Sequence, residues 1–191
     1  MIAKRALDIV VGVPAAIILT PVIVAIALLV TASSGWPPFI VQTRVGALER
    51  PFRMTKFRTM RAGTPTVAKA DLLRSLGERT DAYTPLGRAL RRWSLDEFPQ
   101  IYHVILGTMS LVGPRPALPS QHDLLALRRR ARVTELKPGL TGMAQIRGRE
   151  SLTLPTKVRY EAYYRRNLSI WLDIRILAGT ARALVSRRGA L

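Results

Sequence analysis

The chain has 191 residues, no cysteine and a formal net charge of +18. A chain of this length can bury the core of one domain, and without cysteine it has neither a disulfide framework nor a thiolate metal site. The large positive charge indicates anionic partners, a class that includes nucleic acid, acidic membrane surfaces and phosphorylated substrates.

The N-terminal part is apolar enough to enter a membrane. Residues 9–43 carry no charge, and residues 9–32 are almost purely aliphatic. As an α-helix this stretch would be about 36 Å long, which is enough to cross a bilayer. It is too long for the apolar region of a cleaved signal peptide, and no clean small-residue cleavage pattern follows it.

Two features predict that this helix turns back within the membrane. Pro21 follows Thr20 near the middle of the helix, where it removes a backbone hydrogen bond and clashes with the preceding turn. Lys4 and Arg5 precede the apolar stretch and a strongly basic body follows it, so the positive-inside tendency draws both flanks to the cytoplasmic side. We therefore expect residues 1–35 to form a re-entrant helix–break–helix anchor, and one kinked spanning helix is the alternative.

A small β-hairpin is predicted next. Apolar and polar residues alternate over Phe39–Gln42 and Pro51–Phe57, on either side of a turn at Gly46. Alternation would put Lys56 and Arg58 on one side, as a clamp for phosphate. A solvated basic edge strand is the other interpretation.

Helical patterns follow along the chain. The segment 85–93 combines arginines with leucines and Trp93, which is typical of a helix at an anionic interface, although a solvated basic face fits equally. Asp173, in the last helix, is expected to be a structural partner for an arginine. The predicted class is α+β and mostly helical, with a re-entrant anchor, a hairpin and amphipathic interfacial helices. Helices are predicted at residues 67–76, 85–93, 118–132, 156–166 and 169–186.

The segment Ser94–Pro116 contains the most suggestive polar residues. Asp96 and Glu97 stand at the start of a short apolar helix that runs from about Phe98 to Leu106. Arg115 follows, held between two prolines in a stiff turn. A carboxylate pair facing a fixed arginine is what metal-assisted phosphoryl chemistry needs. An acidic helix start followed by a surface loop is the simpler reading.

A second candidate is the aperiodic segment Lys137–Arg149, with three glycines and three cations. Glycines let a backbone approach an anion closely, and successive N–H groups in turns can form an anion nest. Arg147 and Arg149 are the cations that would meet a diphosphate or a nucleotide.

Four motifs in this order resemble the bacterial sugar transferase family, the monotopic polyprenyl-phosphate phosphoglycosyltransferases, from Lys4 to about Leu177. The resemblance implies transfer of a sugar-1-phosphate from a UDP-sugar to undecaprenyl phosphate, with release of UMP, as the first membrane step of surface glycan or exopolysaccharide biosynthesis. It also implies the re-entrant anchor, with its break at Thr20-Pro21, and a catalytic domain over residues 36–191. The motifs are K-F-R-T-M, S-L-D-E-F-P-Q, S-L-V-G-P-R-P and K-P-G-L-T-G-M-A-Q-I-R-G-R.

The resemblance also suggests roles for individual residues. Asp96 would be the nucleophile that forms an aspartyl-phosphosugar intermediate, and Asp96 and Glu97 would hold Mg²⁺. The expected location is the cytoplasmic face of the bacterial inner membrane, where anionic lipid is a further partner; formation of a homo-oligomer stays open. The implied substrate-binding residues are Lys56, Arg58, Arg91, Arg115, Arg147 and Arg149.

Two positions depart from the family pattern, which has Asn and Asp where this chain has His103 and Thr108. A lone histidine on an apolar helix is expected to be a satisfied core or interface residue. The competing function class is a membrane-tethered basic protein that binds anionic lipid or nucleic acid without catalysis. Two adjacent acids between basic segments disfavour it, and the scattered aromatics make no platform for nucleic acid.

Overall fold

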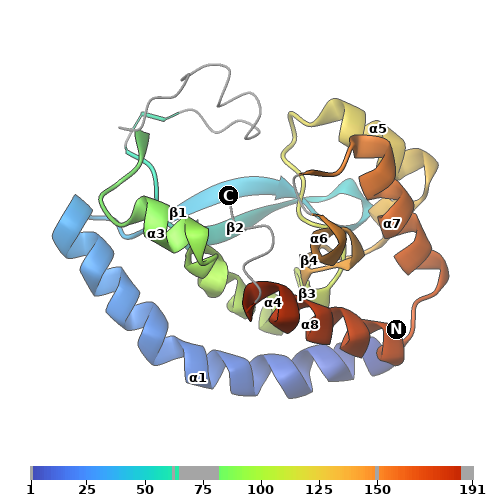
Figure 1. Cartoon of the computed structure of the whole chain (residues 1–191), viewed down its shortest axis with the longest axis horizontal. Coiled ribbons are helices and arrows are strands. Elements are labelled where there is room, and N and C mark those ends of the chain that lie inside the picture. Colours follow the sequence, from blue (N-terminus) through green and yellow to red (C-terminus); the bar gives the residue numbers. More distant parts are fainter. Residues whose placement is uncertain (1, 62, 65–81, 149–150, 186–191) are drawn as a thin grey trace.

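The computed structural model describes residues 2–61, 63–64, 82–148 and 151–185. A long, bowed N-terminal helix runs along one side of the molecule, and a two-stranded hairpin and shorter helices lie on its inner side (Figure 1). The fold is mostly helical with small sheets, which confirms the predicted α+β class. The helix predicted at residues 67–76 lies outside the described residues.

Helix α1 (Ile2–Ser34) runs without interruption through Pro14 and Pro21. The prediction of two helices separated by a break is therefore corrected to one bowed helix (Figure 1). The physical reason is that the fixed φ of proline is close to the helical value, so Pro21 costs hydrogen bonding without ending the helix. The Thr20 hydroxyl adds a bond to this turn by donating to the Ala16 carbonyl at 2.6 Å.

The two faces of α1 have different surroundings. One face packs into the protein core, whereas the opposite face exposes large aliphatic side chains. The helix is long and apolar enough to cross a membrane. An exposed apolar face of this length is typical of contact with lipid or another apolar surface. The buried residues include Ala16, Ile23, Ile26 and Val30, and the exposed ones include Val10, Ile17, Ile18, Val24, Leu28 and Leu29.

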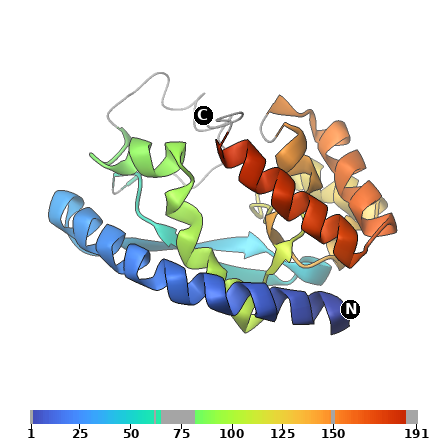
Figure 2. The ribbon, with the colours of Figure 1, turned by 60° about the horizontal axis from the view of Figure 1, so that its bottom comes forward.

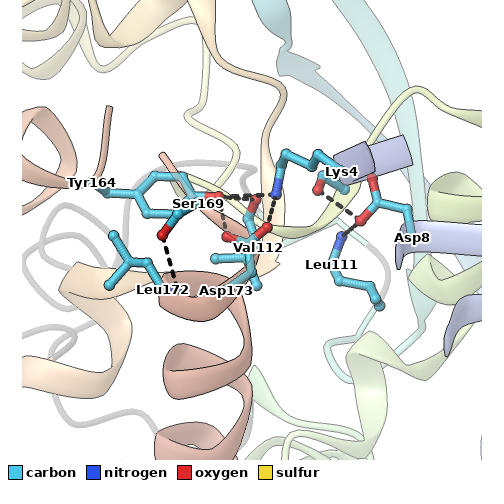
Figure 3. Close-up of polar contacts among 9 residues, drawn as sticks. Lys4, Asp8, Leu111, Val112, Tyr164, Ser169, Leu172 and Asp173 are labelled. Atoms are coloured by element: carbon cyan, nitrogen blue, oxygen red, sulfur yellow. Dashed lines mark hydrogen bonds and ion pairs between the residues drawn. The ribbon is translucent and has the colours of Figure 1, made fainter. Parts of the chain in front are cut away.

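The N-terminal end of α1 is held to the body by a buried polar network (Figure 3). Lys4 Nζ donates to Asp173 Oδ2 at 2.8 Å and to the Tyr164 hydroxyl at 2.9 Å. Asp8 Oδ1 accepts from the Ser110 hydroxyl and from the backbone N–H of Leu111, both at 2.9 Å. Asp173 is thus a structural partner, as predicted, but its partners are Lys4 and Tyr164 rather than an arginine.

The C-terminal end of α1 is also tied to the body. The Arg58 guanidinium donates to the carbonyls of Ser34, Gly35 and Trp36. The last carbonyls of a helix lack intrahelical donors and carry partial negative charge, so an arginine is favourable there.

The predicted β-hairpin is confirmed. Strands β1 (Phe39–Val45) and β2 (Pro51–Phe57) are antiparallel, with Phe39 opposite Phe57 and Val45 opposite Pro51. β1 extends three residues beyond the predicted Phe39–Gln42. The stacked rings of Phe39 and Phe57 lie 5.0 Å apart at the α1 side of the hairpin.

Three short helical segments follow: α3 (Gly87–Arg92), the 3-10 helix η3 (Leu95–Gln100) and α4 (Ile101–Leu106). Ser94 separates α3 from η3 with a left-handed backbone conformation, φ 55°. The apolar helix predicted from Phe98 therefore begins as a tighter 3-10 turn that contains both acids. η3 packs on β2, and α4 packs on α1.

The C-terminal part adds a parallel strand pair and four α-helices. Strand β3 pairs with β4, which the sequence did not predict. Figure 2 shows α8 close to the N-terminal end of α1, in agreement with the Lys4–Asp173 contact. The elements are β3 (Ser110–Val112), α5 (His122–Arg130), η4 (Val133–Glu135), β4 (Gly139–Thr141), α6 (Met143–Arg147), α7 (Leu154–Arg166) and α8 (Ile170–Val185).

Glycines allow this strand pair to form. A Cβ on Gly139 would lie 2.1 Å from the backbone nitrogen of Gly113, and one on Gly142 would lie 2.1 Å from the Gly113 carbonyl oxygen. Such distances are too short for any side chain, so these glycines serve close packing of backbone on backbone.

The main core lies between α1, the hairpin, α4, β3 and α8. It includes Val30 of α1 together with residues of the body, among them Phe57, Val104, Val112 and Ile176. A smaller cluster fills the space around α5 and α7. The apolar helix is therefore part of the same interior as the body.

Candidate active site

Asp96 is a buried carboxylate in η3, with 6% of its surface exposed. Burial, and next the charge of Glu97, raise its pKa to about 6, although Lys56, Arg91 and Arg115 act in the opposite direction. No hydrogen bond or ion pair joins Asp96 to another side chain in the part of the chain that the structure describes. Its oxygens are therefore surrounded by cations without being bound to one.

Lys56, near the end of β2, faces the same charges. It is 9% exposed, and burial together with the charge of Arg91 lowers its pKa to about 8. The nearby carboxylates Asp96 and Glu97 act against this shift. The structure therefore brings Lys56 and Asp96 together, because β2 packs on η3.

Glu97 is paired with Arg115. Arg115 Nη1 donates to Glu97 Oε2 at 3.1 Å, and Nη2 donates to Oε1. The side chains are 25% exposed for Glu97 and 48% for Arg115. This two-point contact orients the guanidinium at the outer edge of the carboxylate pair.

The backbone around Arg115 is held by its neighbours. The Pro114 carbonyl accepts from Gly139 N at 2.9 Å, and the Ala117 carbonyl accepts from Val45 N at 2.9 Å. Between these two positions, the Arg128 side chain donates to the Arg115 carbonyl at 3.0 Å. The Arg44 side chain donates to the Pro116 carbonyl at 3.2 Å. Four consecutive carbonyls are therefore fixed, which explains why the loop can present one side chain in a defined direction.

Arg44 of β1 is a site residue that the sequence analysis missed. Burial, followed by repulsion from Arg115, lowers its pKa to about 10, and Glu97 acts to raise it. Its Nη2 donates to Gln42 at 2.8 Å, while its Nε is buried without a partner. The sequence feature that could have identified Arg44 is that it is the one charged residue in the strand Phe39–Val45.

Arg91 of α3 is a further cation near the carboxylates. Its charge acts on both Asp96 and Lys56, and its guanidinium lies 5.5 Å from the centre of the Tyr83 ring. The sequence-based placement of Arg91 in the site therefore agrees with its surroundings.

Two other candidates, Arg58 and Arg147, are not brought to this cluster. Arg58 binds the end of α1 and is not among the charges that act on Asp96, so the clamp with Lys56 is not formed. Arg147 is exposed at the end of α6. Arg149 lies outside the described residues. Strand β2 ends at Phe57, and Arg58, just beyond it, directs its guanidinium to the carbonyls at the end of α1, which simple alternation did not predict.

The two positions that depart from the family pattern contact each other. His103 Nδ1 lies 3.2 Å from the Thr108 hydroxyl, and His103 Nε2 accepts from Thr55 N at 3.2 Å. The prediction of a satisfied interface histidine is confirmed: His103 links α4 to β2. Burial lowers its pKa, in accord with a neutral ring whose Nε2 is an acceptor.

The carboxylate pair fits one hard cation that arrives with a diphosphate. Mg²⁺ is commonly held by one or two carboxylates together with substrate phosphate oxygens and water. Asp96 offers oxygens that have no side-chain hydrogen-bond partner among the described residues, and Glu97 is the next residue in the chain. No group of three or more His, Asp or Glu side chains occurs in the described segments, so an all-protein metal cage is not the arrangement found there.

Comparison with known proteins gives consistent matches. Residues 1–187 match the family described as bacterial sugar transferase. The chain is 38% identical over 201 residues to a UDP-glucose:undecaprenyl-phosphate glucose-1-phosphate transferase of Xanthomonas campestris, covering all of this chain and 40% of that relative. It is 35% identical to an uncharacterized sugar transferase, EpsL, of Bacillus subtilis, covering 99% of this chain and 90% of the relative.

A third relative comes from Caulobacter vibrioides and carries the same description as that of Xanthomonas. Identity is 34%, covering 98% of this chain and 71% of the relative. The chain thus spans about two fifths of the Xanthomonas protein but most of the Bacillus one.

Proposed function

Because the chain belongs to the bacterial sugar transferase family, we propose that it transfers a sugar-1-phosphate from a UDP-sugar to undecaprenyl phosphate and releases UMP. The observation that carries this proposal is Asp96, a buried carboxylate without a hydrogen-bond partner among the described residues, surrounded by Lys56, Arg91 and Arg115. Cations around one nucleophilic oxygen suit an anionic diphosphate substrate.

The reaction proceeds in two displacements at one phosphorus. An oxygen of Asp96 attacks the phosphorus that bears the sugar, and the bond from this phosphorus to the bridging oxygen breaks. UMP leaves with the bridging oxygen and its electron pair. An oxygen of undecaprenyl phosphate then attacks the aspartyl-phosphosugar, and Asp96 leaves as a carboxylate. The product is an undecaprenyl diphosphate sugar, the starting point for a membrane-bound glycan.

The surrounding residues have separate tasks. Lys56 and Arg91 keep Asp96 partly ionised despite its burial, and they attract the diphosphate. Arg115 is oriented by Glu97 and neutralises charge that develops on the phosphoryl oxygens. Mg²⁺, held by Asp96 and Glu97 with the phosphates, would supply further charge neutralisation when bound.

The acceptor reaches the site through the membrane. Lys4 fixes the N-terminal end of α1 to the body and Arg58 fixes the C-terminal end. Both ends of the apolar helix therefore belong on one aqueous face, which supports a re-entrant path with its bend near Pro21. The protein would then be monotopic, on the cytoplasmic face of the inner membrane, with the acceptor phosphate at the level of the carboxylates.

The test is a search for the covalent intermediate. Purified protein is incubated with Mg²⁺ and each of a panel of UDP-sugars, without undecaprenyl phosphate. About one equivalent of UMP should be released per protein, and the intact mass should rise by one phosphosugar, located on the peptide that contains Asp96. Asp96→Asn should abolish both signals, whereas Glu97→Gln should only slow them.

The outcomes separate the alternatives. An adduct that survives in Asp96→Asn and vanishes in Glu97→Gln would exchange the roles of the two acids. Turnover with undecaprenyl phosphate but no adduct in any variant would indicate direct attack by the lipid. Absence of UMP release with every UDP-sugar, with and without acceptor, would favour the non-catalytic binding function.

A further inference from the structure

A buried ion pair lies behind Arg115. Arg128 of α5 and Glu161 of α7 are 5% and 3% exposed. Arg128 Nε donates to Glu161 Oε2 at 2.8 Å, and Nη2 donates to Oε1 at 2.5 Å. Both groups have lost nearly all contact with water, and a pair of this kind is often no more stabilising than apolar side chains of the same volume.

Among the described residues, the side chains of the pair make one hydrogen bond outside the pair itself. Arg128 Nη2 also donates to the backbone carbonyl of Arg115 at 3.0 Å. Arg115 stands between Pro114 and Pro116, neither of which has an N–H group that could hold the turn. Hydrogen bonds to the carbonyls therefore determine the position of this backbone, and Arg128 supplies the one at Arg115 itself.

Glu161 determines the direction of that donor. Its two oxygens bind Nε and Nη2 of Arg128, so the guanidinium plane is fixed in a two-point geometry. With this plane fixed, Nη2 is aimed at the Arg115 carbonyl. Lysine could keep the charge at this position but not the planar arrangement.

We infer that Arg128 and Glu161 are positioning residues, which set the Arg115 side chain against Glu97 by holding the Arg115 backbone. This inference rests on the proposed function for its catalytic consequence. Neither residue touches substrate in this account; both act through Arg115. A displacement of about 1 Å at a group that stabilises the transition state can cost about 100-fold in rate.

Kinetics of an apolar replacement separate positioning from stability. The double variant Arg128→Met with Glu161→Leu removes both charges and keeps the volume filled, so its melting temperature should stay close to that of the wild type. Its kcat should fall about 10- to 100-fold because the Arg115 carbonyl loses its donor. Arg129→Met is the matched control: Arg129 is the neighbouring residue and pairs with Glu49 on the surface, so this variant should keep the wild-type kcat.

A double-mutant cycle tests whether the effect passes through Arg115. In the background of Arg115→Ala, adding Arg128→Met and Glu161→Leu should cause little further loss of kcat, since the side chain to be positioned is gone. If the loss of kcat from Arg115→Ala and the loss from the Arg128 and Glu161 substitutions multiply in full, the inference is overturned. A wild-type kcat in the double variant would overturn it as well.

Hydrogen exchange provides a measurement that does not depend on the proposed function. In substrate-free protein, the backbone amides of residues 111–113, 115, 117 and 118 should exchange faster in the double variant than in the wild type or in Arg129→Met. Unchanged exchange would contradict the inference even if the wild type is an active transferase. Faster exchange in the double variant, together with a wild type that releases no UMP, would leave the positioning intact and reject the proposed function.

Discussion

Asp96 and Lys56 both have pKa values displaced toward the neutral form, to about 6 and about 8. For each residue, the free-energy cost of burying the charge is thus larger than the stabilisation from the attraction between the two charges. A residue that is unfavourable for folding and central to a site is typical of an activity–stability trade-off.

The first prediction is that Asp96→Asn stabilises the protein while it abolishes transfer. The pKa of Asp96 is raised on folding, so the ionised form destabilises the folded state once the pH exceeds the unfolded value near 3.8, and this penalty grows until the pH passes about 6. Asparagine removes a penalty of about 3 kcal/mol at pH 7.5, from the rise in pKa from 3.8 to about 6. Thermal unfolding should show a higher melting temperature for the variant at pH 7.5 and no difference near pH 4.

Glu97→Gln is the control for this measurement. Glu97 is paired with Arg115 and is partly exposed, so its loss should leave the melting temperature unchanged or lower it. A destabilised Asp96→Asn variant at pH 7.5 would show that the cations around Asp96 outweigh its burial.

The second prediction concerns the acid limb of the pH–rate profile. The nucleophile must be ionised, so kcat/KM should fall as the pH drops through about 6. Lys56 acts to lower the pKa of Asp96. Lys56→Met should therefore move the acid limb to higher pH, in addition to reducing the rate. A limb that stays in place or moves to lower pH would show that another group controls it.

At the scale of the element, helix α1 meets α4 through polar contacts at two places: Arg5 donates to the carbonyls of Val104 and Ile105, and Thr20 contacts Tyr102. The Tyr102 hydroxyl lies 2.8 Å from the Thr20 hydroxyl, which donates to the Ala16 carbonyl. Tyr102 therefore donates to Thr20, beside Pro21. α4 follows η3 directly, so the bow of the membrane helix and the carboxylate pair are joined by a short stretch of packed structure.

The third prediction is that Pro21→Leu lowers activity without unfolding the body. Leucine restores the missing N–H and favours a straighter helix, which would draw α1 away from α4. Transfer to undecaprenyl phosphate should fall, while release of UMP in the first half-reaction should be affected less. Equal loss of both half-reactions would indicate a general effect on folding, and Ile18→Leu, on the exposed face, is the control.

Some elements could be predicted from local pattern and others could not. Alternation of apolar and polar residues predicted the hairpin, and the apolar spacing predicted α3, α4, α7 and α8 to within a few residues. Strands β3 and β4 have three residues each and pair across a long separation in sequence, so neither has a period that can be read. Their glycines were interpreted as an anion nest, although Gly139 and Gly142 instead accommodate the backbone of Gly113.

The site was predictable to a similar extent. Asp96, Glu97 and Arg115 stood out because they lie within one motif. Lys56 followed from the alternation of the strand, and Arg91 from the family resemblance. Arg44 and the pair Arg128–Glu161 were missed because their roles depend on tertiary contacts to loop carbonyls, which leave no local pattern. Arg58 shows the converse case, a motif cation that binds the end of a helix.

At the scale of the whole molecule, the basic body and the apolar helix face different surroundings. Residues 2–34 form one helix with an exposed aliphatic face, and nearly all of the +18 charge lies beyond it. The positive-inside tendency and attraction to anionic headgroups act in the same direction on such a molecule.

The fourth prediction is that both chain ends lie on the cytoplasmic side. Reporter tags at residue 1 and at residue 191 should both give a cytoplasmic signal, because Lys4 and Arg58 bind the two ends of α1 to the same body. A periplasmic signal from the N-terminal tag would contradict the re-entrant path and favour one spanning helix. A soluble cytoplasmic protein carrying the same tags calibrates the signal.

Helix α1 and the body share one hydrophobic core, and this determines whether the body can exist without the helix. The core that contains Phe57 and Val104 also contains Ala16, Ile23 and Val30 of α1. Deleting the helix would thus not release a water-soluble transferase; it would open the protein's own interior to solvent. A bilayer, or a detergent that replaces it, would cover the exposed aliphatic face of α1, and its thickness and composition should then affect the stability of the fold.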